Sequence, residues 1–391
     1  MTKLKGFNGM RAFACLAVLV HHLVQRLDSN NSIVQGLHAG EIGVTIFFVL
    51  SGALLSYPFC YAYLRNQALP SLCSYALKRA ARIIPAFYLV LLLSFIINQA
   101  LTPQDYAWAR FAAALTFTAP YHYISFFPTD INAPLWSVGL EVSCYALLPL
   151  LLWPLLRHKA KSSLRILAYV VALIVITQFA HFLIIKLFMT DPTGKGWRYG
   201  IIGGAKQWLP YWNVASFMGQ FLCGCLAAAI IAKLELRQYR AHWQCDALFI
   251  GILLISGYLS LYVLIPGAAN PVTAQAYLAP LLSLLFAAAL VVSHFSKVAS
   301  RALDNRLFNH IATISFGIYL WHYLVMEVIH LMWVDNYVYA GISDVELWFE
   351  LSLIVCAVSS LLAAFSYYLM ERPIMQWAQQ RCKQSNNKQC R

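Results

Sequence analysis

Long apolar stretches recur along the whole chain and are separated by short polar ones. Each stretch is about as long as a membrane-crossing helix, which needs roughly 20 apolar residues. We place ten such helices at residues 7–27, 42–62, 83–101, 134–156, 165–187, 213–233, 246–266, 274–294, 307–332 and 347–370. The pattern therefore predicts an all-α, polytopic membrane helix bundle of about ten transmembrane helices over residues 1–375. A basic cytoplasmic tail is expected at residues 376–391.

The composition agrees with a membrane protein, because 61% of the residues are hydrophobic and 11% are charged, whereas soluble domains carry about 25% charged residues. The net charge of +13 could indicate nucleic-acid binding, but its distribution favours another explanation. Most lysines and arginines fall in the N-terminus, the C-terminus and alternate loops. The positive-inside rule then predicts that both termini are cytoplasmic. We expect the lipid bilayer, and no nucleic acid, as a partner.

The ten cysteines do not predict a disulfide framework, because none lies in a predicted outer loop, where oxidation would be expected. The pair Cys223 and Cys225 is too small a set for a metal site, so no metal is expected. The first apolar stretch lacks a small-residue cleavage site, so we expect no cleavable signal peptide.

Ionisable residues interrupt several of the predicted helices. Arg11 and His22 are eleven residues apart, about 16 Å along a helix, and share one face, whereas His21 points away from it. Glu141 and His322 are expected at a depth similar to that of His22, in the outer half of the bilayer. Ionisable groups in hydrocarbon are costly. We therefore predict that His22, Glu141 and His322 line one polar cavity, near three further residues: Trp136, Ser137 and Tyr319.

A second group of ionisable residues is predicted at the cytoplasmic interface. Arg79 and Arg82 are three residues apart and so neighbours on a helix face, and Arg11 is expected at the same level. These arginines are either positive-inside anchors or a set of guanidiniums that binds a phosphorylated ligand. A ligand with phosphates and a long flexible arm, such as coenzyme A, would reach from them to the histidines. A neutral histidine there could be a nucleophile or a general base.

Six motifs in this order resemble the acyltransferase 3 family, the bacterial inner-membrane O-acetyltransferases that modify surface glycans. They are Arg11 with His22, GVTIFFVLSG at 43–52, Arg79 with Arg82, Trp136-Ser137 with Glu141, SFGIYLWH at 315–322, and MERP at 370–373.

The resemblance implies an activity and a role for each candidate residue. Acetyl-CoA would be a cytoplasmic co-substrate, with no bound cofactor, and the acetyl group would pass to a hydroxyl of a surface polysaccharide or glycolipid. His22 would be the catalytic base or acyl carrier, and Glu141 would orient a histidine or the acceptor. The three arginines would bind the donor, and Gly52 would permit close helix approach. Ala53 stands where the family typically has Phe, and small residues around Glu141 suggest a wider acceptor pocket.

Two other functions remain open. Intramembrane His and Glu can form the proton relay of a transporter for a lipid-linked sugar or small metabolite, although no inverted repeat is apparent. A receptor or scaffold would leave the buried charges unexplained. In the outer loop at about 188–212, cations and aromatics either contact a sugar or form an interfacial belt; they are Lys195, Trp197, Arg198, Tyr199, Lys206, Trp208, Tyr211 and Trp212.

Overall fold

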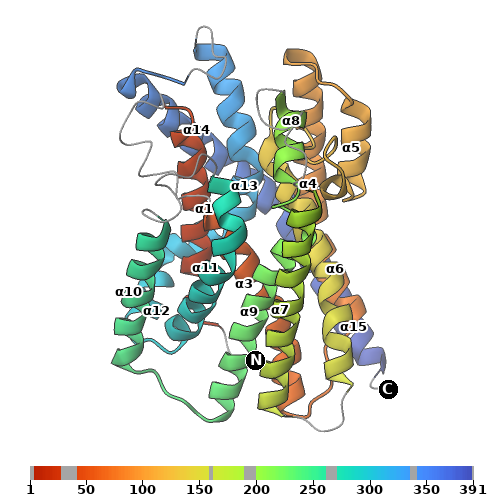
Figure 1. The fold of residues 1–391 in the computed structure, drawn as a ribbon, viewed down its shortest axis with the longest axis vertical. Helices are drawn as coiled ribbons and strands as arrows, with labels where there is room; N and C mark the ends of the chain where they lie inside the picture. The colour runs from red at the N-terminus through yellow and green to blue at the C-terminus, as the bar shows by residue number, and fades with distance from the viewer. Residues whose placement is uncertain are drawn as a thin grey trace.

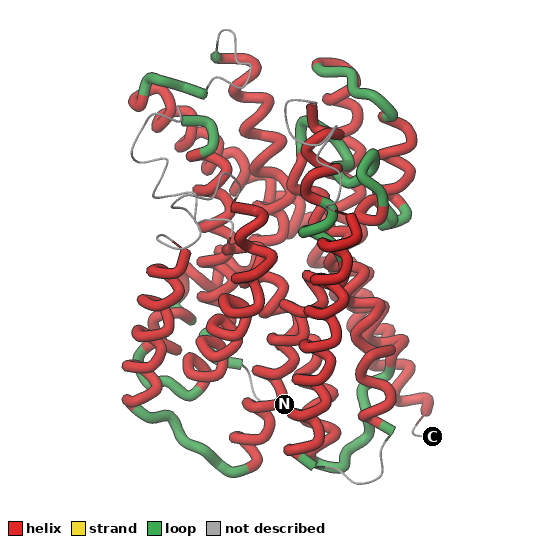
Figure 2. The backbone as a smooth tube through the Cα atoms, in the orientation of Figure 1, coloured by secondary structure: helices red, strands yellow, loops and turns green. Residues whose placement is uncertain are grey.

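The computed structural model describes residues 4–27, 42–157, 162–188, 200–260, 271–334 and 341–389. Figure 1 shows these residues as an elongated bundle of helices running roughly along one axis. Within the described ranges, helices and their connecting loops make up the backbone and no β-strand is assigned (Figure 2). Residues 189–199, which include Lys195, Trp197, Arg198 and Tyr199 of the predicted outer loop, lie outside these ranges.

Eight helical segments of the described chain are long and apolar enough to cross a membrane. They are α1 (Phe7–Val24), α3 (Ile42–Leu64), α4 (Leu72–Leu101), α6 (Trp136–Leu156) with the preceding turn η3 (Ala133–Leu135), α7 (Ser163–Phe188), α9 (Val214–Leu236), α13 (Arg306–Trp333), and the run formed by α14 (Val345–Ser366), η6 (Tyr367–Glu371) and α15 (Arg372–Gln389). Two shorter apolar helices complete the set: α10 (Trp243–Tyr258) and α11 (Pro271–His294), of which Pro280–His294 is the apolar run. These helices coincide with the ten predicted stretches, so the all-α membrane bundle is confirmed.

Two boundaries differ from the sequence-based expectation. Helix α4 begins at Leu72 rather than near residue 83, with the Ser71 hydroxyl accepting from the Ser74 N–H at 3.4 Å. This early part of α4 is helical because it packs against α15 (Figure 1). Residues 376–389, which the sequence suggested as a tail, continue α15 as part of the same helix.

The centre of the bundle is the contact between α3 and α9, which two glycines make unusually close. A Cβ atom on Gly52 would lie 1.9 Å from the carbonyl oxygen of Phe221, and one on Gly224 would lie 1.9 Å from that of Val49. Small residues at such positions let two membrane helices pack backbone to backbone. Gly52 therefore permits the close helix approach expected of it, and the partner helix is α9.

Helix α1 is fixed against the C-terminal part of the bundle. The N–H of Gly6 donates to Asp304 at 2.9 Å, and Asn8 donates to Asn309 at 2.6 Å. Asp304 follows the short helix α12 (Ala299–Leu303), and Asn309 is in the first turns of α13. These contacts set the register in which α1 runs beside α13. In Figure 1 the N- and C-terminal labels lie toward the same end of the bundle, as expected for two termini on one side of the membrane.

Candidate functional site

A cavity lined by arginines lies between α1, α3, α4, α6 and α13. All three arginines of the predicted donor-binding group line it, so their convergence is confirmed. The polar lining residues are Arg11, Ser51, Arg79, Arg82, Ser137, Glu141, Tyr145, Ser315 and Tyr319. Phe47, Phe48, Leu54 and Ile83 contribute to its apolar walls. Three guanidiniums around one space make it suited to an anionic ligand with several phosphate oxygens.

Helix α4 contributes Arg79 and Arg82 to this cavity. Their spacing of three residues puts both side chains on one helix face, and this face is turned toward the bundle. Lys78, which directly precedes Arg79, is exposed and is not among the lining residues. The position of Arg82 is also fixed by α15, because its Nη1 atom lies 3.9 Å from the sulfur of Met375.

Glu141 lines the arginine cavity. Its Oε1 atom accepts a hydrogen bond from the Ser51 hydroxyl at 3.0 Å and another, short one, from the hydroxyl of Tyr145. No contact with His22 or His322 is found for it within the described part of the chain. The carboxylate of Glu141 therefore lies in the cavity with the three arginines, and its depth relative to the histidines stays a prediction.

The two histidines do meet, as the sequence predicted. His22 Nδ1 lies 2.9 Å from His322 Nε2, which joins α1 to α13. His322 Nδ1 faces the carbonyl oxygens of Ile318 and Tyr319, at 3.0 and 2.8 Å. His322 is 1% exposed, so no bulk water competes for these bonds.

This arrangement determines where the protons lie when both rings are neutral. A carbonyl oxygen only accepts, so His322 Nδ1 must carry a hydrogen and its Nε2 must be an acceptor. The Nδ1–H of His22 then donates to that Nε2. The Nε2 atom of His22 is consequently left with a free electron pair, which is what a general base requires.

His21, the neighbour of His22, faces a different partner. Its Nε2 atom lies 3.0 Å from the side-chain nitrogen of Gln25, which can only donate. His21 is 4% exposed. This contact joins His21 to a residue of its own helix, one turn further on.

Tyr319 separates the histidine pair from the arginine cavity. It lines the cavity, while its ring lies 5.8 Å from that of His322 and 6.1 Å from that of Phe47. Its hydroxyl is 2.6 Å from the Ser137 hydroxyl and donates to the carbonyl oxygen of Pro134 at 3.0 Å. Neither His22 nor His322 is among the cavity-lining residues. The histidine pair therefore lies next to the cavity, with Tyr319 between them.

Trp136 points away from this cavity, although Ser137 next to it lines the wall. Its ring stacks on that of Trp212 at 4.3 Å and on that of Phe126 at 5.5 Å. Trp136 is 7% exposed and Phe126 is fully buried. Trp136 therefore belongs to an aromatic stack at the start of α6, and its place in an acceptor pocket stays a prediction.

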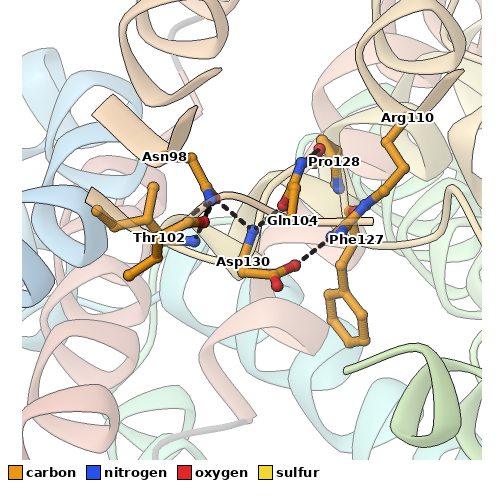
Figure 3. A network of polar contacts seen from close by, with 8 residues as sticks. Asn98, Thr102, Gln104, Arg110, Phe127, Pro128 and Asp130 are labelled. Carbon is orange, nitrogen blue, oxygen red and sulfur yellow. Dashed lines mark hydrogen bonds and ion pairs between the residues drawn. The ribbon is translucent and has the colours of Figure 1, made fainter. Parts of the chain in front are cut away.

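The segment before α6 is held inside the bundle by the polar network of Figure 3. Asn98 on α4 accepts the N–H groups of Asp130 and Ile131 at 2.9 and 3.0 Å. Arg110, on the short helix α5 (Ala107–Leu115), donates to the carbonyl oxygen of Phe127 at 2.6 and 2.8 Å and pairs with Asp130 at 2.6 Å. Ile131 and Phe127 are buried. Helix α6 therefore follows a loop that is itself bonded to α4 and α5.

Sequence reasoning missed a polar group beside the histidines. Arg26 pairs with Glu327 and donates to the hydroxyl of Tyr323 at 2.7 Å. The Tyr323 ring packs edge-on against His22 at 5.1 Å. A glutamate inside the apolar run of α13, and an arginine one helical turn after His22, were the available signals.

The chain is similar to several known O-acetyltransferases. The O-acetyltransferase OatA of Staphylococcus aureus is 26% identical over 384 residues, which cover 95% of this chain and 57% of that protein. The peptidoglycan O-acetyltransferase OatA of Listeria monocytogenes is 26% identical over 388 residues, covering 94% and 55%. A putative O-acetyltransferase of S. aureus is 23% identical over 392 residues, covering 95% and 57%.

The chain thus spans a little more than half the length of the curated relatives it matches. No solved structure gives a significant match. The family model described as an acyltransferase domain matches residues 4–370, which include the three arginines, Glu141 and both histidines. The chain therefore belongs to the acyltransferase 3 family.

Proposed function

We propose that this chain is a membrane-embedded O-acetyltransferase that moves an acetyl group from cytoplasmic acetyl-CoA to a hydroxyl of a carbohydrate acceptor. The acceptor is a surface polysaccharide or a glycolipid, and the protein works in the bacterial inner membrane. The names of the relatives support O-acetyl transfer, and one of them names peptidoglycan as its target.

The observation that carries the proposal is that two sites lie next to each other. One is lined by Arg11, Arg79 and Arg82, and the other contains the hydrogen-bonded pair of His22 and His322. A donor with phosphates at one end and a reactive thioester at the end of a flexible arm needs both. The arginines bind the phosphates by charge-assisted hydrogen bonds, and the arm extends past Tyr319 toward the histidines.

The chemical step uses the free electron pair of His22 Nε2. The acceptor hydroxyl gives its proton to this nitrogen while its oxygen attacks the thioester carbonyl carbon. The carbon–sulfur bond then breaks, and the thiolate of coenzyme A takes the proton from His22. The bond to His322 fixes the His22 ring and its tautomer during both transfers.

The remaining candidate residues have supporting roles. Ser137 and Tyr319 line the arginine cavity and contact either the acetyl-bearing arm of the donor or the acceptor. Trp136 supports Ser137 from the aromatic stack. Glu141 offsets part of the arginine charge and fixes Tyr145 through its hydrogen bond, so that the cavity accepts a phosphorylated donor without excess positive charge.

Purified protein in lipid vesicles tests the proposal with isotope-labelled acetyl-CoA and a carbohydrate acceptor. We expect label on the carbohydrate, and we expect surface glycans of a deletion strain to lose acetyl groups relative to the parent. Movement of sugar across the vesicle membrane without acetylation would instead identify the transporter alternative. Unchanged glycan acetylation in the deletion strain would overturn the proposal.

A further inference from the structure

The motif MERP, residues 370–373, contributes no group to the proposed chemistry, but it sits at an unusual helical turn. Pro373 has no amide hydrogen, and in a regular α-helix its ring would clash with the carbonyl of Leu369. The chain avoids this conflict by widening into the π-helical turn η6, in which the N–H of Arg372 donates to the carbonyl of Tyr367, five residues earlier. Such turns rotate the following helix face and often occur at functional sites.

The wide turn places Glu371 inside the protein. Its side chain is 1% exposed, and its Oε1 atom accepts a hydrogen bond from the Ser366 hydroxyl at 3.2 Å. Its Oε2 atom is buried and makes no hydrogen bond within the described part of the chain. A buried carboxylate oxygen without a partner is costly unless a positive charge is near.

Arg82, on the neighbouring helix α4, is a positive charge next to this turn. Met375 lies four residues after Glu371, so both project from the same helix face, and Met375 is the residue that the guanidinium of Arg82 contacts. The turn η6, which ends at Glu371, packs against α4, the helix that carries Arg82. On its other side Arg82 lines the cavity together with Arg11 and Arg79.

We infer that Glu371 is a positioning residue that holds the guanidinium of Arg82 at the cavity wall and so strengthens the binding of an anionic donor. Arg11, Arg79 and Arg82 repel one another in a low-dielectric site. A fixed carboxylate behind Arg82 opposes this repulsion and keeps the cation from moving toward the cytoplasm. The inference rests on the proposed role of Arg82 in donor binding.

The test measures the affinity of purified, full-length protein for coenzyme A. Glu371→Gln keeps the size of the side chain and removes its charge. We expect its dissociation constant to rise roughly fivefold or more, as is common when a supporting partner of a ligand-binding group is lost. Glu371→Asp, which keeps the charge, should retain most of the affinity. In an Arg82→Ala background Glu371→Gln should have little further effect, whereas in an Arg79→Ala background its effect should persist.

Each other outcome has a distinct meaning. Unchanged affinity in Glu371→Gln, or an equal loss in the Arg82→Ala background, overturns the inference while leaving the proposed function intact. Unchanged affinity in Arg82→Ala itself removes the donor site and the inference together. Thermal unfolding of Ser366→Ala, which removes the other partner of Glu371, measures the cost of disturbing the turn. If Glu371→Gln does not fold, the affinities of Glu371→Asp and Glu371→Asn are compared instead, since these two shorter side chains also differ only in charge.

Discussion

His22 Nδ1 and His322 Nε2 lie 2.9 Å apart, and the two backbone carbonyls behind His322 determine the direction of the hydrogen bond between them. Because His322 donates to those carbonyls, it accepts from His22. The pair therefore presents one basic nitrogen, Nε2 of His22. The neighbouring histidines of α1, His21 and His22, should therefore differ in their effect on activity.

The first prediction compares those neighbours. His22→Ala should abolish acetyl transfer while leaving expression and donor binding largely intact, because alanine cannot accept the hydroxyl proton. General-base help contributes factors of about 10²–10⁴ in rate. His21→Ala, which loses the contact with Gln25, should keep much of the activity. Turnover is measured with labelled acetyl-CoA, and equal rates for the two variants would contradict the assignment.

The second prediction concerns His322. His322→Gln offers an amide oxygen that can accept from His22 Nδ1, whereas His322→Leu offers no acceptor. We therefore expect the Gln variant to retain substantially more kcat than the Leu variant, with similar donor KM in both. If the two variants have the same kcat, the hydrogen bond to His22 does not support catalysis.

The third prediction concerns the donor. Arg79→Ala or Arg82→Ala should weaken acetyl-CoA binding by about 1.5–3 kcal/mol each, the scale of a hydrogen bond to a charged group. Substitution by Lys should restore only part of the lost binding free energy, because Lys keeps the charge but not the bidentate geometry. Lys78→Ala is the matched control, since Lys78 is exposed on the same helix and should bind donor normally. Donor affinity equal to wild type in the arginine variants would leave them as topological anchors.

The fourth prediction concerns membrane orientation. Cys73 is exposed at the start of α4, on the side that the positive-inside rule assigns to the cytoplasm. A membrane-impermeant thiol reagent should label it only after cells are opened, with Cys73→Ser as the blank. Labelling in intact spheroplasts would reverse the assigned orientation.

The fifth prediction concerns the contact between α3 and α9. Gly52→Ala places a methyl group 1.9 Å from the carbonyl oxygen of Phe221, so the helices must move apart. We expect a loss of about 1–3 kcal/mol, typical of overpacking, seen as a lower Tm in detergent. Gly251→Ala is the control, because nothing lies within 4 Å of a Cβ there. Equal Tm values in both variants would show that the close approach is not required.

The sequence predicted most of the fold because the signal for a membrane helix is local. An apolar stretch of sufficient length must satisfy its backbone internally, so it becomes a helix whatever surrounds it. The early start of α4 was missed because Lys78, Arg79 and Arg82 interrupt the apolar pattern there. The helix continues through them because α15 packs alongside, a contact between segments almost 300 residues apart.

The candidate site was predictable where it depends on spacing along one helix. Arg79 and Arg82 share a face for that reason. The partners of Glu141 were not predictable in this way, since Ser51 belongs to another helix. The loop before α6 is likewise held by side chains of α4 and α5, Asn98 and Arg110, which the spacing along α6 does not reveal. The tautomer of His22 likewise depends on backbone carbonyls of another helix.

The hydrogen bond between Tyr319 and Ser137 also bears on how this membrane holds its ion gradients. A continuous water-filled path from the arginine cavity to the histidines would conduct protons, each driven by about 2.3 kcal/mol per 100 mV of membrane potential. With Tyr319 bonded to Ser137 and Pro134, an aromatic ring stands across that path. We therefore expect this ring to hinder proton flow when no donor is bound, and a narrow donor arm to fill the space when the ring moves aside.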